Sequence, residues 1–291
     1  MDTYPPPEVN TKSPGFNMPP GACDTQIHIY GPTDRYPLKP DRVYEPHLVG
    51  IEEVLRMHKT LGIERCVLIS PTVYGADNSC MIDALRQQGT NYRGIAVIDD
   101  GTSDAELGAM NEAGVRGVRC NFAGFLNMTP DPDLFRRTVA RITPLGWHVV
   151  VHVLGEDLIE YENLFREVRI PLVIDHMCHL DLTIETDKRA LDILMDMLRR
   201  DNCWIKISNG DRVSHAGPPD YTDVIPLGRA LADIAPDRAI WGTDWPHVLY
   251  KKPAMANDGD LLNLLAKYVP DETARNRILV DNPAALYGFN G

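Results

Sequence analysis

Short apolar stretches alternate with longer amphipathic stretches along most of the chain. An apolar run of about four to eight residues is typical of a buried strand, and apolar residues three or four positions apart are typical of a helix. Strand-like runs cover 22–29, 66–70, 92–98, 115–121, 147–153, 171–176, 203–208 and 238–241. Helical spacing covers 48–61, 78–88, 104–113, 131–143, 157–168, 187–200, 223–234, 260–268, 271–280 and 282–287.

This alternation predicts the fold class. Eight strand-like runs separated by helical ones are the pattern of an α/β protein built as a (β/α)8 barrel, here with additional C-terminal helices. A doubly wound open sheet is the alternative, but neither a GxGxxG motif nor a P-loop follows the first run. Residues 1–20 contain six prolines and little apolar periodicity. We therefore expect a proline-rich N-terminal arm or lid at 1–20 and a single barrel domain at 21–291.

Composition and charge narrow the classes of partner. Hydrophobic residues make up 44% of the chain and charged residues 24%, as in an ordinary globular protein. The net charge of −12 makes nucleic acid and anionic membranes poor partners, and no apolar run approaches the ~20 residues of a membrane span. The six cysteines form no CxxC pair, and the polar N-terminus has no signal-peptide core. We expect a cytoplasmic protein that binds a small molecule, and a homo-oligomer is left open.

Polar residues recur where the predicted strands end. Residues two apart in a strand share a face, so Asp24, Gln26 and His28 are expected on one side of the first strand. Later strands end in, or are followed by, the polar residues Arg119, His152, His176 and Asp244. The ends of parallel barrel strands meet at one mouth. The residues expected to form a site there are Gln26, His28, His152, His176 and Asp244, with Arg119 beside them.

The other histidines are interpreted from their positions. His58 falls in a predicted helix, His47 in a loop and His148 at the start of its strand, so all three are expected to be structural. His179 and His215 lie in loops near the mouth, and their roles are left open.

Three stretches at the strand ends resemble a known family. They are DTQIH at 24–28, IDHM at 174–177 and WGTDWPH at 241–247. Together they resemble the amidohydrolase superfamily, in its amidohydrolase 2 branch, over most of the chain. The resemblance is strongest to the 2-pyrone-4,6-dicarboxylate lactonases, and the galactarolactone isomerases are similar in having Asp-Thr-Gln-x-His at the first strand. It implies a TIM barrel enzyme that opens a carboxylated lactone with water, in a setting such as aromatic degradation.

Hydrolysis of a lactone requires an activated water, a polarised carbonyl group and an oriented ring. Asp244 is the expected general base, which takes a proton from water. His28 and His176 are expected to donate hydrogen bonds to the carbonyl oxygen as it becomes an oxyanion. The Gln26 amide is a third expected donor, and His152 either joins these groups or contacts the substrate.

The resemblance also implies substrate-binding residues. Arg119 and Arg212 look like the carboxylate-binding arginines of the lactonases, a role that suits the planar fork of a guanidinium group. Tyr44 and Thr72 resemble substrate-contacting positions in loops. His247, three residues after the expected base, is a further candidate for contact with the substrate.

Two departures from the family pattern change these expectations. The lactonases carry another basic residue shortly after the strand-four arginine, whereas residues 121–125 are uncharged here. The expected lactone is therefore less charged, or more apolar, than the pyrone dicarboxylate. Metal-dependent relatives bind a divalent ion through a His-x-His on the first strand, and Gln26 replaces the first of these histidines. An amide oxygen is a weaker zinc ligand than imidazole, so we expect no cofactor, as the resemblance to the lactonases also implies.

Three alternatives stay open. A metal-dependent hydrolase or decarboxylase of the same branch would hold Zn or Mn with His28, His152, His176 and Asp244. A metal-independent isomerase of sugar-acid lactones would use Asp244 to relay a proton without adding water. A binding protein without catalytic activity is the third alternative.

Overall fold

The structure is a computed structural model that describes residues 4–289. Its strands are β1 (Cys23–Ile27), β2 (Arg65–Ile69), β3 (Tyr92–Ala96), β4 (Val115–Asn121), β5 (His148–His152), β6 (Leu172–Ile174), β7 (Cys203–Lys206) and β8 (Ala239–Ile240). The helices between them are α1 (Ile51–Leu61), α2 (Ser79–Gln88), α3 (Asp104–Ala113), α4 (Pro132–Ile142), α5 (Gly155–Glu167), α6 (Glu185–Leu198), α7 (Gly210–Val213) and α8 (Ile225–Ile234). After β8 come α9 (Asp258–Tyr268), α10 (Glu272–Asn276) and α11 (Asn282–Tyr287).

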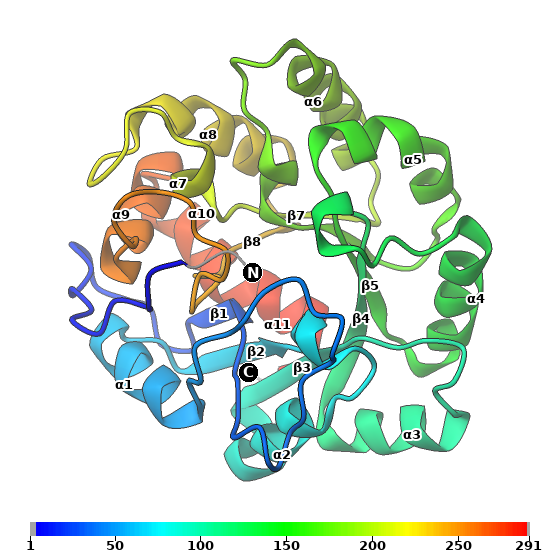
Figure 1. Ribbon diagram of the computed structural model, residues 1–291. Helices are drawn as coiled ribbons and strands as arrows, with labels where there is room; N and C mark the ends of the chain where they lie inside the picture. Colours follow the sequence, from blue (N-terminus) through cyan, green and yellow to red (C-terminus); the bar gives the residue numbers. More distant parts are fainter. Residues whose placement is uncertain (1–3, 290–291) are drawn as a thin grey trace.

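The strands form one parallel sheet in the order β1 to β8, with helices outside the ring (Figure 1). Hydrogen bonds between β1 and the segment after β8 close the ring. Thr25 N–H donates to Trp241 O at 3.1 Å, and Asp244 N–H donates to Gln26 O at 3.0 Å. Gly242 is required at this closure, because a Cβ atom there would lie 2.6 Å from Gln26 N. The predicted (β/α)8 barrel is confirmed.

The interior of the barrel is apolar at the end covered by α11 and polar at the carboxyl ends of the strands. Inward-facing strand residues form an inner cluster that includes Val67, Ile95, Val150, Val173 and Ile240. Tyr287 of α11 and Phe289 join this cluster, and Arg93 at the start of β3 donates to Tyr287 O. Figure 1 shows α11 across the ring. Because this end is closed, polar side chains inside the barrel reach solvent through the mouth at the carboxyl ends of the strands.

The described part of the predicted arm, residues 4–20, contains no helix or strand. Lys12 binds the first turn of α9 through Asn257 Oδ1 (3.0 Å) and Asp260 Oδ2 (2.7 Å). Tyr4 is buried against Tyr44, with their ring centroids 6.4 Å apart. The arm therefore lies behind a residue expected to contact the substrate. Residues 1–3 of the arm and 290–291 of the predicted domain lie outside the described residues.

Several predicted boundaries differ from the structure. β6, β7 and β8 stop one or two residues before the ends of their apolar runs, because the next residues turn into the mouth. The helix predicted at 271–280 divides into α10 and a π-helical segment (Arg277–Asp281). The four-residue helix α7 was not predicted, since so short a segment shows no periodicity.

The prediction that Asp24 shares a face with Gln26 and His28 is wrong. The register between β1 and β2 shifts within this stretch. The Asp24 carboxylate accepts a hydrogen bond from Thr243 Oγ1 at 2.6 Å and lies 3.3 Å from His58 Nε2 of α1. Asp24 therefore ties β1 to α1 and to the loop after β8, and His58 has the structural role expected for it.

Two expectations from composition can be compared with the structure. All six cysteines are free, and five of them are buried. Within residues 4–289 no helix combines the length and apolar character that crossing a membrane requires.

Candidate active site

A cavity of about 360 Å³ opens at the mouth of the barrel. Eight residues expected from the sequence line it: His28, Tyr44, Thr72, Arg119, His152, His176, Arg212 and Asp244. Further polar lining comes from His179, Asn209, Lys251 and Lys252, and apolar lining from Phe125, Leu126, Val248 and Leu249. The mouth thus gathers residues from most of the strands at one place.

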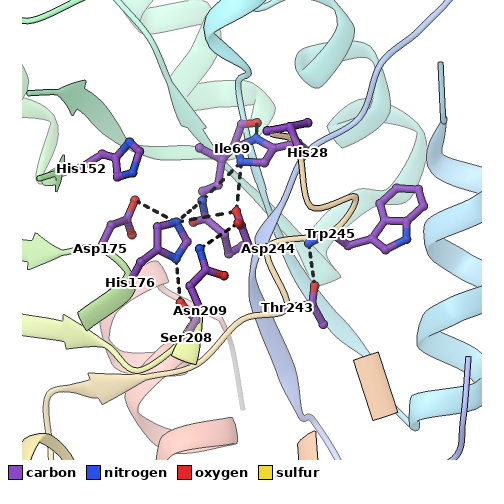
Figure 2. Close-up of polar contacts among 12 residues, drawn as sticks. His28, Ile69, His152, Asp175, His176, Ser208, Asn209, Thr243, Asp244 and Trp245 are labelled. Carbon is purple, nitrogen blue, oxygen red and sulfur yellow. Dashed lines mark hydrogen bonds and ion pairs between the residues drawn. The ribbon is translucent and has the colours of Figure 1, made fainter. Parts of the chain in front are cut away.

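Asp244 lies between two imidazoles, as Figure 2 shows. Its Oδ2 accepts hydrogen bonds from Asn209 Nδ2 and Arg212 Nη2, both at 2.9 Å. Its Oδ1 lies 3.6 Å from His28 Nε2 and 3.7 Å from His176 Nε2. Burial alone would raise the pKa of Asp244, but its neighbours, among them the permanently charged Arg212 guanidinium, outweigh burial and hold it well below its usual range. The carboxylate is therefore ionised at neutral pH, with one oxygen anchored and the other directed at the imidazoles.

The backbone at this site is strained. His176, Asn209 and Asp244 have φ values of 53°, 63° and 66°, in the left-handed region that side chains other than glycine rarely adopt. Such residues cost about 1–3 kcal/mol each and concentrate at functional sites. All three follow strand ends, so the strain turns their side chains into the mouth.

His28 presents a lone pair to Asp244 when it is neutral. Its Nδ1 lies 2.9 Å from Ile69 O, and a carbonyl oxygen can only accept a hydrogen bond, so the proton is on Nδ1. The Nε2 atom that faces Asp244 then carries no proton. The expectation that neutral His28 donates to a carbonyl oxygen through Nε2 is inconsistent with this tautomer.

His176 has the same arrangement. Its Nε2 faces Gln26 Nε2 and Arg119 Nη2, each at 3.4 Å. Both neighbours carry N–H groups, so the His176 Nε2 accepts, and its Nδ1–H points to Ser208 Oγ at 2.8 Å. Burial lowers the pKa of His176 well below the usual range, which keeps the ring neutral at neutral pH.

His152 belongs to a second group at the edge of the cavity. Its Nε2 lies 3.0 Å from His179 Nε2, and the ring of Phe125 meets it edge-on at 5.8 Å. Burial lowers the pKa of both histidines, that of His179 to about 4. This pair of neutral rings and an exposed phenyl ring form one wall, which suits contact with the ring of a substrate.

A family model described as amidohydrolase matches residues 23–289. The chain belongs to the amidohydrolase family. This match confirms the family inferred from the strand-end motifs, of whose residues His28 and His176 flank Asp244.

Named relatives of this amidohydrolase act on lactones. The 4-sulfomuconolactone hydrolase of Rhizobium radiobacter is 38% identical over 97% of this chain and 95% of its own length. The 2-pyrone-4,6-dicarboxylate hydrolase of Comamonas testosteroni is 37% identical over 96% of this chain and 94% of its own length. The D-galactarolactone isomerase of Agrobacterium fabrum is 30% identical, over 96% of this chain and 95% of its own length.

His247 lies outside the cavity that a substrate contact would require, whereas Arg212 lines the cavity and also binds groups of the site itself. Arg212 donates to Asp244 and, through Nη1, to Val248 O at 3.1 Å, so it holds the carboxylate in place. His247 is fully buried, does not line the cavity, and lies 3.0 Å from Asp258 Oδ1 at the start of α9. In this amidohydrolase His247 therefore anchors the loop after β8, because its side chain is directed away from the mouth.

Tyr44 and Thr72 both line the cavity. The Tyr44 hydroxyl is 3.0 Å from that of Tyr30, and burial raises its pKa. Tyr30 and Tyr4 pack on Tyr44 edge-to-face, which fixes the direction of its hydroxyl group. Both expected residues therefore reach the cavity, with Tyr44 held by the barrel on one side and the arm on the other.

The alternative metal site of His28, His152, His176 and Asp244 is surrounded by N–H groups, which donate hydrogen bonds and cannot bind a metal ion. His152 is directed to His179 instead of Asp244. The space between the other three is faced by the Gln26 amide N–H and the Arg119 guanidinium, which repel a cation. Among residues 4–289 no group of three or more His, Cys, Asp or Glu is arranged to hold a metal ion. The residues therefore do not fit a divalent ion.

Two residues of the site were missed from the sequence. Asn209 holds Asp244, and Lys206, fully buried on β7, lies 2.8 Å from Asp175 Oδ1. Asp175 also accepts from Arg119 Nε at 2.8 Å. A lysine inside the apolar run 203–208 was a visible signal for Lys206, since a charge there must be buried with a partner. Asn209 lies beyond that run and gave no comparable signal.

Proposed function

We propose that this amidohydrolase hydrolyses a lactone that bears an anionic substituent, and that it does so without a metal ion. The observation that carries the proposal is the environment of Asp244. Its Oδ2 is anchored by two donors, and its Oδ1 faces two imidazole nitrogens that carry lone pairs. This is a group of proton acceptors suited to activating water. The relatives named as hydrolases of 4-sulfomuconolactone and 2-pyrone-4,6-dicarboxylate support the same class of reaction.

The charge of the cavity supports an anionic substrate. Its basic lining residues are Arg119, Arg212, Lys251 and Lys252, and its one acidic lining residue is Asp244. This local excess of positive charge contrasts with the net charge of −12 of the whole chain. Within the described residues Lys251 forms no ion pair, whereas Lys252 Nζ donates to Ser214 O at 2.8 Å. An ammonium group without a partner at the rim suits a carboxylate or sulfonate on the lactone.

In the proposed reaction Asp244 accepts a proton from water while the water oxygen attacks the lactone carbonyl carbon. Arg119, which reaches the same space as His176, donates to the carbonyl oxygen as negative charge develops. Loss of one such donor typically reduces the rate about 10²–10³-fold. The ring C–O bond then breaks, and the ring oxygen takes back the proton, so the products are a carboxylic acid and a hydroxyl or its keto form.

Isomerisation of a lactone is a second candidate. It is favoured by the relative named D-galactarolactone isomerase and by the three proton acceptors around one point. The same Asp244 would move a proton between substrate oxygens without adding water. Acid release separates the two reactions, because isomerisation releases no acid.

The test is a panel of carboxylated and sulfonated lactones, followed by acid release at constant pH with and without EDTA. We expect turnover of at least one anionic lactone by the wild type, no effect of EDTA, and a loss of about 10³-fold or more in Asp244→Asn, as for removal of a general base. Activity that is lost on chelation and restored by zinc or manganese would overturn the metal-free reaction. The cytoplasmic location, a homo-oligomer and the absence of nucleic-acid partners stay predictions.

A further inference from the structure

Lys206 is a buried cation that the proposed reaction does not yet use. Its side chain has no exposed surface, and its Nζ lies 2.8 Å from Asp175 Oδ1 and also contacts Gln26 Oε1. Asp175 pairs with Arg119 as well, so two cations share one carboxylate beneath the cavity. Burying an ammonium group is costly even when it is paired. Apolar side chains of similar volume would stabilise the barrel as much as this buried ion pair does. Stability therefore does not account for the lysine, which points to another role.

The contact with Lys206 determines how the Gln26 amide is oriented. An ammonium group has three donors and no acceptor, so the Gln26 atom that it touches must be the carbonyl oxygen. The amide nitrogen then faces the other way, 3.4 Å from His28 Nε2 and 3.4 Å from His176 Nε2. One –NH2 group has two protons, one for each imidazole.

This orientation matches the tautomers that the other contacts of the two rings require. His28 directs Nδ1–H to Ile69 O, and the Arg119 guanidinium, which can only donate, requires an acceptor at His176 Nε2 and so leaves the Nδ1–H of that ring for Ser208 Oγ. Each ring thus keeps its lone pair on Nε2, close to Asp244 Oδ1. With the amide reversed, a carbonyl oxygen would face both Nε2 atoms and would favour the other tautomer.

We infer that Lys206 is a positioning residue for catalysis: through Gln26 it holds the Nε2 lone pairs of His28 and His176 toward Asp244. The inference rests on the proposed function. Once Asp244 has taken the proton of the attacking water, the nearest acceptors are these two nitrogens. One of them takes the proton from Asp244 and delivers it to the ring oxygen as the ring C–O bond breaks, so Asp244 is ionised again at the end of the cycle.

Lys206→Met and Gln26→Leu, alone and combined, test the inference. The control is Lys188→Met, because Lys188 is an exposed residue of α6. We expect each single variant to lower kcat about 10- to 100-fold with little change in KM, which is less than the roughly 10²–10⁴-fold contribution of an acid or base itself, because the histidines remain in place. Because Lys206 acts through Gln26, the double variant should be no more than a few-fold slower than the slower single variant. Multiplied losses would mean that the two residues act separately and would overturn the inference.

Imidazole ¹⁵N spectra at fixed pH give a readout that does not depend on turnover. In the wild type, both rings should carry a proton on Nδ1, and His176 should be neutral, with signals assigned by comparison with His28→Gln and His176→Gln. Gln26→Glu keeps the shape and the Lys206 contact but directs an acceptor at both rings, so at least one ring should change to the Nε2–H or doubly protonated form. Unchanged tautomers in both Gln26→Glu and Lys206→Met would overturn the inference. If no lactone is turned over by the wild type, the proposed function fails, while these spectra still test the link from Lys206 to the rings.

Discussion

Replacing Arg212 by methionine separates two roles for this arginine. The sequence suggested that it binds a substrate carboxylate, whereas in the structure its Nη2 donates to Asp244 Oδ2 at 2.9 Å and its Nη1 to Val248 O at 3.1 Å. Methionine retains much of the apolar stem but removes both donors and the guanidinium group, whose Cζ lies 5.3 Å from the centre of the Tyr250 ring. Asp244 is left with Asn209 as its anchor. The carboxylate then rotates more freely, and its pKa rises because a neighbouring cation is lost.

The size of the effect follows from the contact that is removed. A hydrogen bond to a charged group contributes about 1.5–3 kcal/mol. If this stabilisation is needed for the geometry of the transition state, kcat falls about 10- to 150-fold. KM should change by less than about threefold, because Arg212 positions the general base, and a loss that affects only the transition state lowers kcat and kcat/KM equally. Arg212→Lys keeps the charge but not the planar fork of the guanidinium group, so its kcat should lie between those of the wild type and Arg212→Met.

Steady-state kinetics on the best lactone of the panel measure both constants. Arg137→Met is the matched control, because Arg137 pairs with Asp100 on the outer surface and should leave both constants unchanged. A large rise in KM with an unchanged kcat in Arg212→Met would refute the reasoning and return Arg212 to the role of substrate ligand. Thermal melting checks that each variant is folded.

Two further predictions concern pH and the cavity wall. Burial lowers the pKa of His148 to about 3, whereas an unfolded histidine titrates near 6.5. As the pH falls, the unfolded chain therefore binds this proton first. The free energy of unfolding should be constant above about pH 6.5 and should be about 2 kcal/mol lower at pH 5 because of this residue. Urea unfolding at pH 8, 6 and 5 measures this, and a flat profile, or the same decline in His148→Phe, would contradict it. Phe125 is half exposed at the cavity, so Phe125→Ala should raise KM by about 2- to 10-fold through lost ring contact while the melting temperature stays unchanged. An unchanged KM would mean that the substrate ring does not reach this wall.

The sequence predicted the barrel and most of its mouth for reasons that can be stated. The apolar runs have the length of buried parallel strands, and the spacing between them leaves room for a helix. Once eight such units are recognised, the residues at their ends must meet, because parallel strands in a barrel all end at the same side. This is why His28, His152, His176, Arg119 and Asp244 could be placed together from the sequence.

The hydrogen-bond and ion-pair partners of the buried polar side chains could not be predicted in the same way. Asp24 was assigned to the wrong face because a register shift in β1 interrupts the alternation of side chains. His247 and Asp244 are three residues apart, and nothing in their spacing shows that one side chain enters the cavity while the other is buried against Asp258. Asn209 gave no signal, since an asparagine after a strand is common in turns.

The number of strands and the approximate positions of their ends could thus be predicted from local apolar patterning, which each short segment carries by itself. The partners of the polar side chains were determined only by the tertiary structure. Lys206 and Gln26 lie on two different strands and Asp175 directly follows a third, so their ion pair and hydrogen bond exist only when the barrel closes. The direction of the Gln26 amide, and with it the side of each imidazole that faces Asp244, depends on which donor or acceptor comes within about 3 Å after closure. That distance is a property of the folded barrel and of no single stretch of the chain.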